Sequence, residues 1–212
     1  MADTYFTLEA PGRAEHTVDG SRFLSEAVAV TSQAAAEDAI SSVRAREHAA
    51  THHCFAYRLG ATGDTFRYDD DGEPSGTAGP PILRRIDAHD LTNTLVVVTR
   101  YFGGTELGTG GLARAYGHAA AAALERANHA QRVVRTTVRI RYAYDDTAPA
   151  ERVLQHFDAL VHDSEYTDVT TLTVGVRESQ VEAFVDAFRN ALSDRGELLR
   201  VGGPEGDTEG RD

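Results

Sequence analysis

LVVVTRYFGGTELGTGGLARAYGHAAAAALERA, residues 95–127, places a strand, a glycine-rich loop and a helix in direct succession. Leu95–Val98 is a continuous apolar run, mostly β-branched, which is typical of a strand buried on both faces. Glycines crowd residues 103–111, which indicates a loop. Leu112–Ala127 is rich in alanine and predicts a helix. The stretch therefore predicts a sheet whose buried strand leads through a loop into a helix.

The residues before this stretch predict further elements of the same domain, 1–131. Ser32 is a good N-cap for an alanine-rich helix that ends near Glu47. Gly60–Gly63 separates two short strands and predicts a hairpin. The other expected elements are a lead-in over residues 1–15, strands at Ser21–Val30, Cys54–Leu59 and Thr65–Tyr68, a loop at Asp69–Pro81, and a helix at Ile82–Ala88.

Beyond residue 131 the pattern changes and predicts a second domain, 132–203. Val134–Tyr144 alternates, with Val138, Ile140, Tyr142 and Tyr144 on one face and Arg135, Arg139 and Arg141 on the other. The following helix is expected to carry an apolar stripe of Val153, Phe157, Leu160 and Val161. The remaining expected elements are strands near Ser164–Tyr166 and at Thr170–Val176, a helix with Val181, Phe184, Val185, Phe188 and Leu192 on one face, and a last strand at Glu197–Val201. The order β-α-β-β-α-β is the ferredoxin-like plan, so the fold class is α+β with two domains, followed by a disordered acidic tail at 204–212.

The composition describes an acidic chain without lysine. Its 212 residues include 33 acidic and 21 basic ones, with a formal net charge of −12, and all the basic residues are arginine. This combination is typical of a halophilic protein in concentrated intracellular salt, whereas a GC-rich genome explains the arginines but not the acidity. In such salt counterion release contributes little, so the negative charge does not exclude a nucleic-acid partner. The single cysteine, Cys54, leaves no disulfide partner within the chain, and no apolar run is long enough for a membrane helix, so we expect a cytoplasmic protein with no membrane contact.

The first candidate site is the acidic loop, which runs from Asp69 to Gly79. Asp69, Asp70, Asp71 and Glu73 together can bind a divalent cation or perform acid–base chemistry. The spacing does not fit an EF-hand, and a solvated acidic turn is an equally good interpretation. The adjoining Pro74–Gly79 segment favours a functional loop over a solvated turn, because its residues fix the backbone and expose N–H groups.

The second candidate site is the glycine loop, residues 103–111. A strand, a glycine-rich loop and a helix together present N–H groups and a helix dipole to an anion, and Arg100 and Arg114 can add positive charge. The sequence is no Walker motif, and its G-x-G-x-x-A pattern lacks the acid of a dinucleotide fingerprint because Glu125 lies inside the predicted helix. The alternative is that the glycines only allow tight packing.

Two further patterns favour ordinary structural roles. On a strand, His52 and Cys54 face one way and His53 the other, so at most two could share a metal, and packing of Cys54 is the better interpretation. His52, at the start of its strand, can reach the acidic loop. A basic sheet face such as that of Val134–Tyr144 is typical of RNA-recognition domains, but its tyrosines alternate onto the opposite face, which favours a solvated surface.

Four segments together resemble the IMPACT/YigZ family: SRF at residues 21–23, HHCFAY at 52–57, DDGEPSGTAG at 70–79 and RYFGGTELGTGGL at 100–112. The resemblance implies an N-terminal domain with a ribosomal-protein-like βαβ two-layer sandwich, a fold shared with small-metabolite kinases of the galactokinase type. It also implies a C-terminal domain similar to the last domain of elongation factor G. Eukaryotic members regulate translation by blocking activation of a starvation-responsive initiation-factor kinase, but they carry a different partner domain. For prokaryotic members, nucleic-acid or ribosome binding has been suggested.

Two functions follow as hypotheses. The first is a translation-associated regulator that binds RNA or the ribosome in a cleft between the acidic loop and the glycine loop. The alternative is a metal-dependent enzyme acting on a phosphorylated small molecule or nucleotide, with Gly108–Gly111 cradling phosphate, with Asp70, Asp71 or Glu73 holding a divalent cation as the one cofactor, and with His52 as acid or base. The ribosome-like relatives of both domains favour the first, and no catalytic residue is assigned. The predicted ligand-binding residues are His52, Asp70, Asp71, Glu73, Ser75, Thr77, Arg100, Tyr101, Gly103, Gly104, Gly108, Gly110, Gly111 and Arg114.

Overall fold

The computed structural model describes residues 3–206 of the chain, which divides into two compact units. One unit comprises Tyr5–Gln131, and the other comprises the residues from Arg132 onward together with the first few of the chain. The last strand, β10 (Glu197–Gly206), runs past the domain end expected at residue 203. Of the predicted acidic tail, residues 207–212 lie outside the described residues, and 204–206 belong to β10.

An antiparallel sheet forms the centre of the first unit, in the order β2-β3-β6-β4-β5. Its strands are β2 (Gly12–Val18), β3 (Ser21–Ala29), β4 (His52–Leu59), β5 (Thr65–Asp69) and β6 (Thr94–Tyr101). Strand β6 is buried along nearly its whole length, which confirms the interpretation of Leu95–Val98 as a strand covered on both faces. The 60–63 turn joins β4 to β5 as a hairpin, as predicted.

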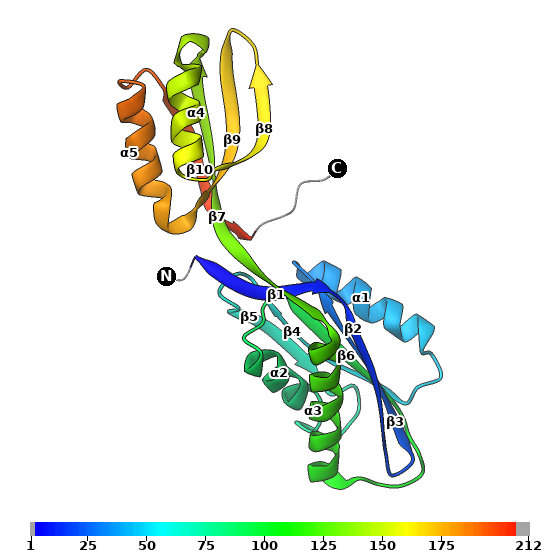
Figure 1. Cartoon of the computed structure of the whole chain (residues 1–212). Helices are drawn as coiled ribbons and strands as arrows, with labels where there is room; N and C mark the ends of the chain where they lie inside the picture. The colour runs from blue at the N-terminus through cyan, green and yellow to red at the C-terminus, as the bar shows by residue number, and fades with distance from the viewer. Residues whose placement is uncertain (1–2, 207–212) are drawn as a thin grey trace. The chain divides into compact units, whose positions relative to one another are not determined.

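Helices cover both faces of this sheet (Figure 1). The helices are α1 (Gln33–Arg46), α2 (Gly79–Ala88) and α3 (Gly108–Arg126). On one face α2 and α3 bury Ile82, Ile86 and Tyr116 against the sheet, and on the other α1 buries Ile40 and Val43 against β4 and β6. The sheet with α2 and α3 forms the two-layer sandwich that the family resemblance implies, and α1 adds a third layer on the other face of the sheet.

The helix starts have clear local causes. Ser32 accepts a hydrogen bond from the Ala35 N–H at 3.1 Å and caps α1, as predicted. Helix α2 begins at Gly79, earlier than expected, because Pro80 and Pro81 occupy its first turn, where their missing N–H groups leave no helical hydrogen bond unmade. Helix α3 begins at Gly108 rather than Leu112, so the last glycines of the glycine loop form its first turn.

The expected lead-in over residues 1–15 contains two strands that sequence reasoning did not predict. Strand β1 (Thr4–Ala10) pairs with β7 (Asn128–Ala143), and β2 follows after Pro11. Gly12 opens β2 at a place where a Cβ atom would lie 2.0 Å from the Ala123 carbonyl oxygen of α3. Gly12 thus allows β2 to pack closely on a helix.

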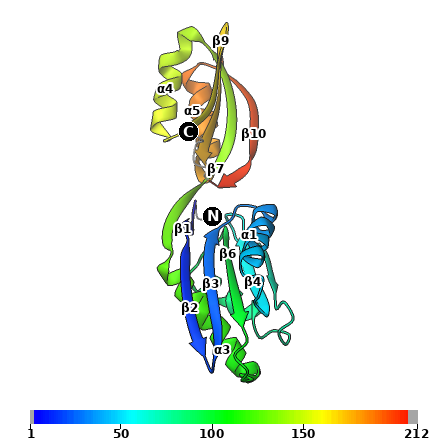
Figure 2. The same ribbon diagram turned by 90° about the vertical axis from the view of Figure 1, so that its right-hand side faces the viewer.

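The second unit has the predicted ferredoxin-like order (Figure 1 and Figure 2). Its elements are β7, α4 (Thr147–His156), β8 (Leu160–Tyr166), β9 (Val169–Arg177), α5 (Val181–Ala191) and β10, with short 3₁₀ turns at Tyr144–Asp146 and Glu178–Gln180. Strand β7 lies between β9 and β10, and β8 pairs with the outer side of β9, all antiparallel. Val138, Ile140 and Tyr142 pack with Phe184 and Phe188 in its core.

Three details of the second unit differ from expectation. Leu160 and Val161 are exposed in β8 rather than on a helical stripe, because α4 ends at His156 and Asp158 takes a left-handed φ of 49°. Tyr144 lies beyond the strand and is 62% exposed. Arg135 is buried instead of solvated, because the carbonyl of Asp158 accepts from its Nη1 at 2.7 Å.

Candidate functional site

The acidic loop between β5 and α2 is held in shape by Asp70. The Oδ1 atom of Asp70 accepts hydrogen bonds from the N–H groups of Ala78 at 2.9 Å and Gly79 at 2.8 Å, and Oδ2 accepts from the N–H of Gly76 at 2.8 Å. The Asp70 carbonyl accepts from the Cys54 thiol at 3.1 Å. Both carboxylate oxygens are therefore used to fold the loop onto the start of α2.

Asp71 connects the same loop to α1 and β4. Its Oδ1 lies 2.7 Å from the Arg44 guanidinium, and its Oδ2 accepts from the His53 N–H at 2.6 Å. The Asp71 backbone has φ +43°, and its carbonyl lies 2.7 Å from the His52 Nδ1 atom. A left-handed aspartate costs some backbone strain, which these contacts offset.

Glu73 forms a buried ion pair with Arg100, whose side chain leaves β6 toward the α2 and α3 face of the sheet. The two side chains are 3% and 5% exposed, and Arg100 Nη1 donates to Glu73 Oε1 at 2.7 Å. The Tyr116 hydroxyl donates to the same oxygen at 2.7 Å, and Arg100 Nη2 donates to Ser21 Oγ at 3.2 Å. Burial and the neighbouring Cys54 raise the pKa of the Tyr116 hydroxyl, so it stays protonated and keeps donating.

His52 and Cys54 border this ion pair. The His52 Nε2 atom lies 3.9 Å from Glu73 Oε1, and the His52 side chain is 20% exposed. Cys54 is fully buried, and burial raises the pKa of its thiol well above the ordinary value. A protonated, buried thiol is a poor nucleophile, so Cys54 has a packing role.

The acidic residues are engaged with protein donors rather than left open for a cation. Within residues 3–206, no group of three or more His, Cys, Asp or Glu side chains has an arrangement that could hold a metal ion. Both carboxylate oxygens of Asp70 and of Asp71, and the Oε1 atom of Glu73, accept from N–H or O–H groups, whose hydrogens occupy positions that a cation would take.

The glycine loop connects β6 to α3 and is exposed. A Cβ atom at Gly103 would lie 1.9 Å from the Gly20 carbonyl carbon, so this position is fixed by packing. At Gly104 and Gly108 φ is positive, and no atom lies within 4 Å of the Cβ position. Leu107 precedes α3 and makes no side-chain cap, and Gly108, Thr109 and Gly110 in the first turn of the helix are exposed.

The structure gathers some of the predicted residues and separates others. His52, Asp71, Glu73 and Arg100 meet around the buried ion pair. Tyr101 points to the opposite face of the sheet, where its hydroxyl donates to Glu47 at 2.9 Å. Among the predicted residues not yet described, Thr77 is buried and its hydroxyl donates to the Pro74 carbonyl. Ser75 is exposed, and Arg114 is exposed on α3 beside Gly110.

Sequence reasoning missed Tyr116 and Arg44 as partners of the acidic loop. Tyr116 lies on the buried face of α3, where its spacing is that of any core residue, and no sequence signal distinguishes its hydroxyl. Ser21 lies in one of the segments that carry the family resemblance, and its Oγ accepts from both Arg100 and the Gly103 N–H.

The arginine face of β7 in the second unit is matched by carboxylates. Arg139 pairs with Glu165 at 3.2 Å, and Arg141 pairs with Glu197. These cross-strand ion pairs leave little free positive charge, as expected for a solvated face.

Comparison with known proteins shows the family of the chain. Residues 19–124 match the model of the Impact N-terminal domain, and residues 140–195 match a domain of unknown function, DUF1949. The chain belongs to the IMPACT family. It is 35% identical over 187 residues to the IMPACT family member YvyE of Bacillus subtilis (strain 168), covering 87% of this chain and 85% of the relative. It is 33% identical over 177 residues to the IMPACT family member YigZ of Escherichia coli (strain K12), covering 82% and 87%.

A solved structure described as a hypothetical protein also resembles this IMPACT family chain. The match has a TM-score of 0.72 at 29% identity and covers 94% of this chain and 98% of the other. Among the described residues, no helix is long and apolar enough to cross a membrane.

Proposed function

We propose that the chain is a translation-associated protein that binds RNA through the glycine loop and the first turn of α3. The observation that carries the proposal is the open start of α3, where Gly108, Thr109 and Gly110 are exposed and no side chain caps the helix. The first N–H groups of a helix lack intrahelical acceptors and lie at the positive end of its dipole. They attract phosphate groups, and glycine lets the backbone approach them closely.

Side chains beside the helix start support RNA over an isolated phosphate. Phe102 is 49% exposed at the beginning of the loop, and the Arg100 guanidinium lies 5.3 Å from its ring centroid. An exposed aromatic ring next to a phosphate site offers a surface on which a base can stack. Arg114, exposed on the next turns of α3, adds a cation for the backbone.

The acidic loop is compatible with this proposal because its charges are already compensated. Arg44 neutralises Asp71, and Arg100 neutralises Glu73 below the surface. Glu73 of this loop binds Arg100, and Arg100 donates to the same Ser21 Oγ atom that accepts from the Gly103 N–H, so buried contacts connect the acidic loop to the glycine loop. The alternative metal-dependent enzyme has less support, since these carboxylates would have to release their protein donors to hold a cation.

The test uses two variants of Thr109 that differ in charge. Fluorescence polarisation with a labelled single-stranded uridine dodecamer, repeated from dilute buffer to molar KCl, measures RNA binding. Thr109→Glu should weaken binding by about tenfold, the effect of roughly 1.4 kcal/mol of charge repulsion, while the acid in the first turn of α3 maintains or raises thermal stability. Thr109→Gln, of the same size and neutral, should bind like the unmodified protein.

Phe102→Ala tests the stacking surface separately, because it removes the exposed ring without changing the start of α3. It should also weaken binding of the dodecamer. Arg100 is unsuitable as a probe, since its loss breaks the buried ion pair. Co-sedimentation with ribosomal subunits in high salt tests the translational setting. Absence of binding to both the dodecamer and ribosomal subunits, or equal affinities for the Thr109→Glu and Thr109→Gln proteins, would contradict the proposal.

A further inference from the structure

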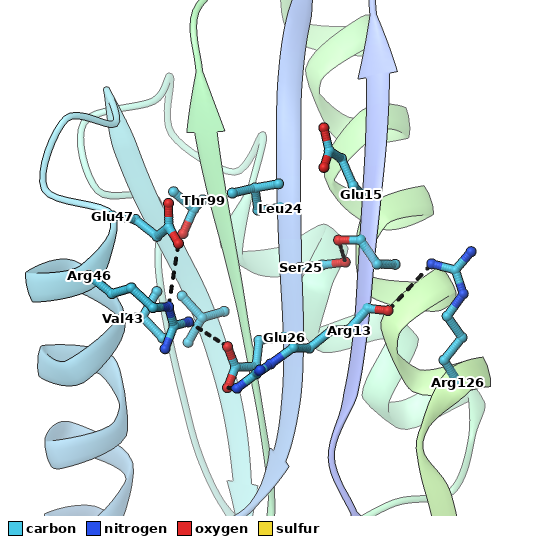
Figure 3. Close-up of a pocket in the computed structure, with 12 residues that line it drawn as sticks. Arg13, Glu15, Leu24, Ser25, Glu26, Val43, Arg46, Glu47, Thr99 and Arg126 are labelled. Atoms are coloured by element: carbon cyan, nitrogen blue, oxygen red, sulfur yellow. Dashed lines mark hydrogen bonds and ion pairs between the residues drawn. The ribbon is translucent and has the colours of Figure 1, made fainter.

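A groove lies on the α1 face of the first unit's sheet (Figure 3). Helix α1 packs on β4 and β6, and the groove opens beside it over β2, β3 and β6. It has a volume of about 380 Å³, and an adjoining hollow of about 190 Å³ shares several of its lining residues. Apolar contacts for a ligand come from Leu24 and Val97 on the sheet and Val43 on α1.

One carboxylate at the centre of the groove is paired from both sides. Arg13 of β2 donates to Glu26 Oε1 at 2.9 Å, and Arg46 of α1 donates to Oε2 at 2.6 Å. The Glu26 side chain is 17% exposed, whereas those of Arg13 and Arg46 are 68% and 48% exposed. Both guanidiniums therefore keep N–H groups on the solvent side, with the carboxylate holding them in place.

The groove is lined by three arginines and three glutamates, and because Glu15 pairs with Arg22 outside the lining, one positive charge is left over. Glu47 accepts from the Tyr101 hydroxyl at 2.9 Å and lies 3.4 Å from Arg46 Nε, and Glu15 is paired with Arg22. Arg126, at the end of α3, is exposed, and it donates to the Arg13 carbonyl at 3.4 Å. No carboxylate within residues 3–206 pairs with Arg126.

We infer that this groove binds a small organic anion with an apolar body. The body would lie on Leu24, Val43 and Val97, and the anionic group would meet the guanidinium of Arg126 at the β2 edge of the groove. The volume lies at the lower end of the range for small-molecule sites, and an apolar lining with a few fixed polar groups is their usual composition. This inference is independent of RNA binding, because none of the residues that line the groove belongs to the glycine loop or to the first turn of α3.

A pair of fluorescent probes separates the anionic and apolar contributions. The probe 8-anilinonaphthalene-1-sulfonate carries a sulfonate on an apolar ring system, and N-phenyl-1-naphthylamine is the same molecule without the sulfonate. We expect saturable binding of the sulfonate probe to the folded chain in dilute buffer, and weaker binding of the neutral probe. Added salt should reduce the difference in affinity between the two probes, because it screens the charge of the exposed guanidiniums.

Three substitutions locate the site. Arg126→Gln should weaken the sulfonate probe about two- to fivefold, as expected for one exposed ion pair, and leave the neutral probe unchanged. Leu24→Gln should weaken both probes, with circular dichroism checking that the sheet is retained. Arg84→Gln removes the same charge from an exposed position on α2 and should change neither probe. Sulfonate-probe binding that is unaffected by Arg126→Gln, or that is weakened equally by Arg84→Gln, would overturn the inference.

Discussion

Replacing Arg100 with methionine removes the cation of the buried ion pair and leaves the Glu73 carboxylate in place. In the unmodified protein, Glu73 Oε1 accepts from both Arg100 Nη1 and the Tyr116 hydroxyl, each at 2.7 Å. In Arg100→Met only the Tyr116 hydrogen bond remains, on a carboxylate side chain that is 3% exposed. The substitution therefore leaves the Glu73 charge buried without its arginine counter-charge.

Breaking a buried ion pair from one side costs about 3–5 kcal/mol of the free energy of unfolding, chiefly because the remaining charge stays desolvated. The double variant Glu73→Gln/Arg100→Met removes both charges and keeps an amide oxygen for Tyr116. It should be more stable than Arg100→Met alone, even though it carries one more substitution. Between residues in direct contact the coupling energy is about 0.5–3 kcal/mol.

Urea unfolding at constant KCl, followed by circular dichroism, measures the free energies. Because two units can unfold separately, hydrogen exchange of peptides from β6 and α3 assigns the loss to the first unit. A loss below about 1 kcal/mol for Arg100→Met would be the value expected of an exposed pair. That result, or a double variant as unstable as the sum of the two single ones, would refute the reasoning.

Three other perturbations have defined outcomes. Gly103→Ala forces a Cβ against the Gly20 backbone and should lower the melting temperature measured by thermal unfolding, with an unchanged melting temperature contradicting the packing role. Burial and the adjacent His118 ring lower the pKa of His16, so the folded state favours its neutral form and stability should fall as pH drops below about 6.5. His16→Gln should remove that part of the pH dependence in melting curves between pH 8 and 5, and an identical pH profile would count against it. Cys54 should react slowly with iodoacetamide at pH 8 in the native protein and rapidly in urea, whereas fast native labelling would show an accessible thiol.

Much of the fold could be predicted because its signals are local. The β-branched run at Leu95–Val98, the Ser32 cap and the alternation in β7 each contain their own evidence. Strands β1 and β2 have no such evidence, since Pro11 between them and Gly12 at the start of β2 have the composition of a loop. Only the close approach to α3 gives Gly12 its role in a strand.

The candidate site was less predictable because its contacts join distant segments. The sequence placed His52 and the acidic loop among the predicted residues, and the structure brings them together. It gave no sign that Glu73 would be buried, since an acidic run is ordinarily solvated. The burial of Arg135 could not be predicted for the same reason. The Asp158 carbonyl that accepts its hydrogen bond lies 23 residues away, so the alternation of apolar and polar residues in β7 does not reveal it.

The burial of Glu73 constrains how the acidic loop can vary. Surface loops ordinarily tolerate insertions and deletions, because little in the core depends on their length. Here an interior arginine on β6 depends on a carboxylate that reaches it from the loop, 27 positions earlier in the chain. A change of length would move that carboxylate away and leave Arg100 enclosed with no anion. The length of this loop is therefore set from inside the molecule, and variation between relatives should be confined to residues such as Ser75, whose side chains face solvent.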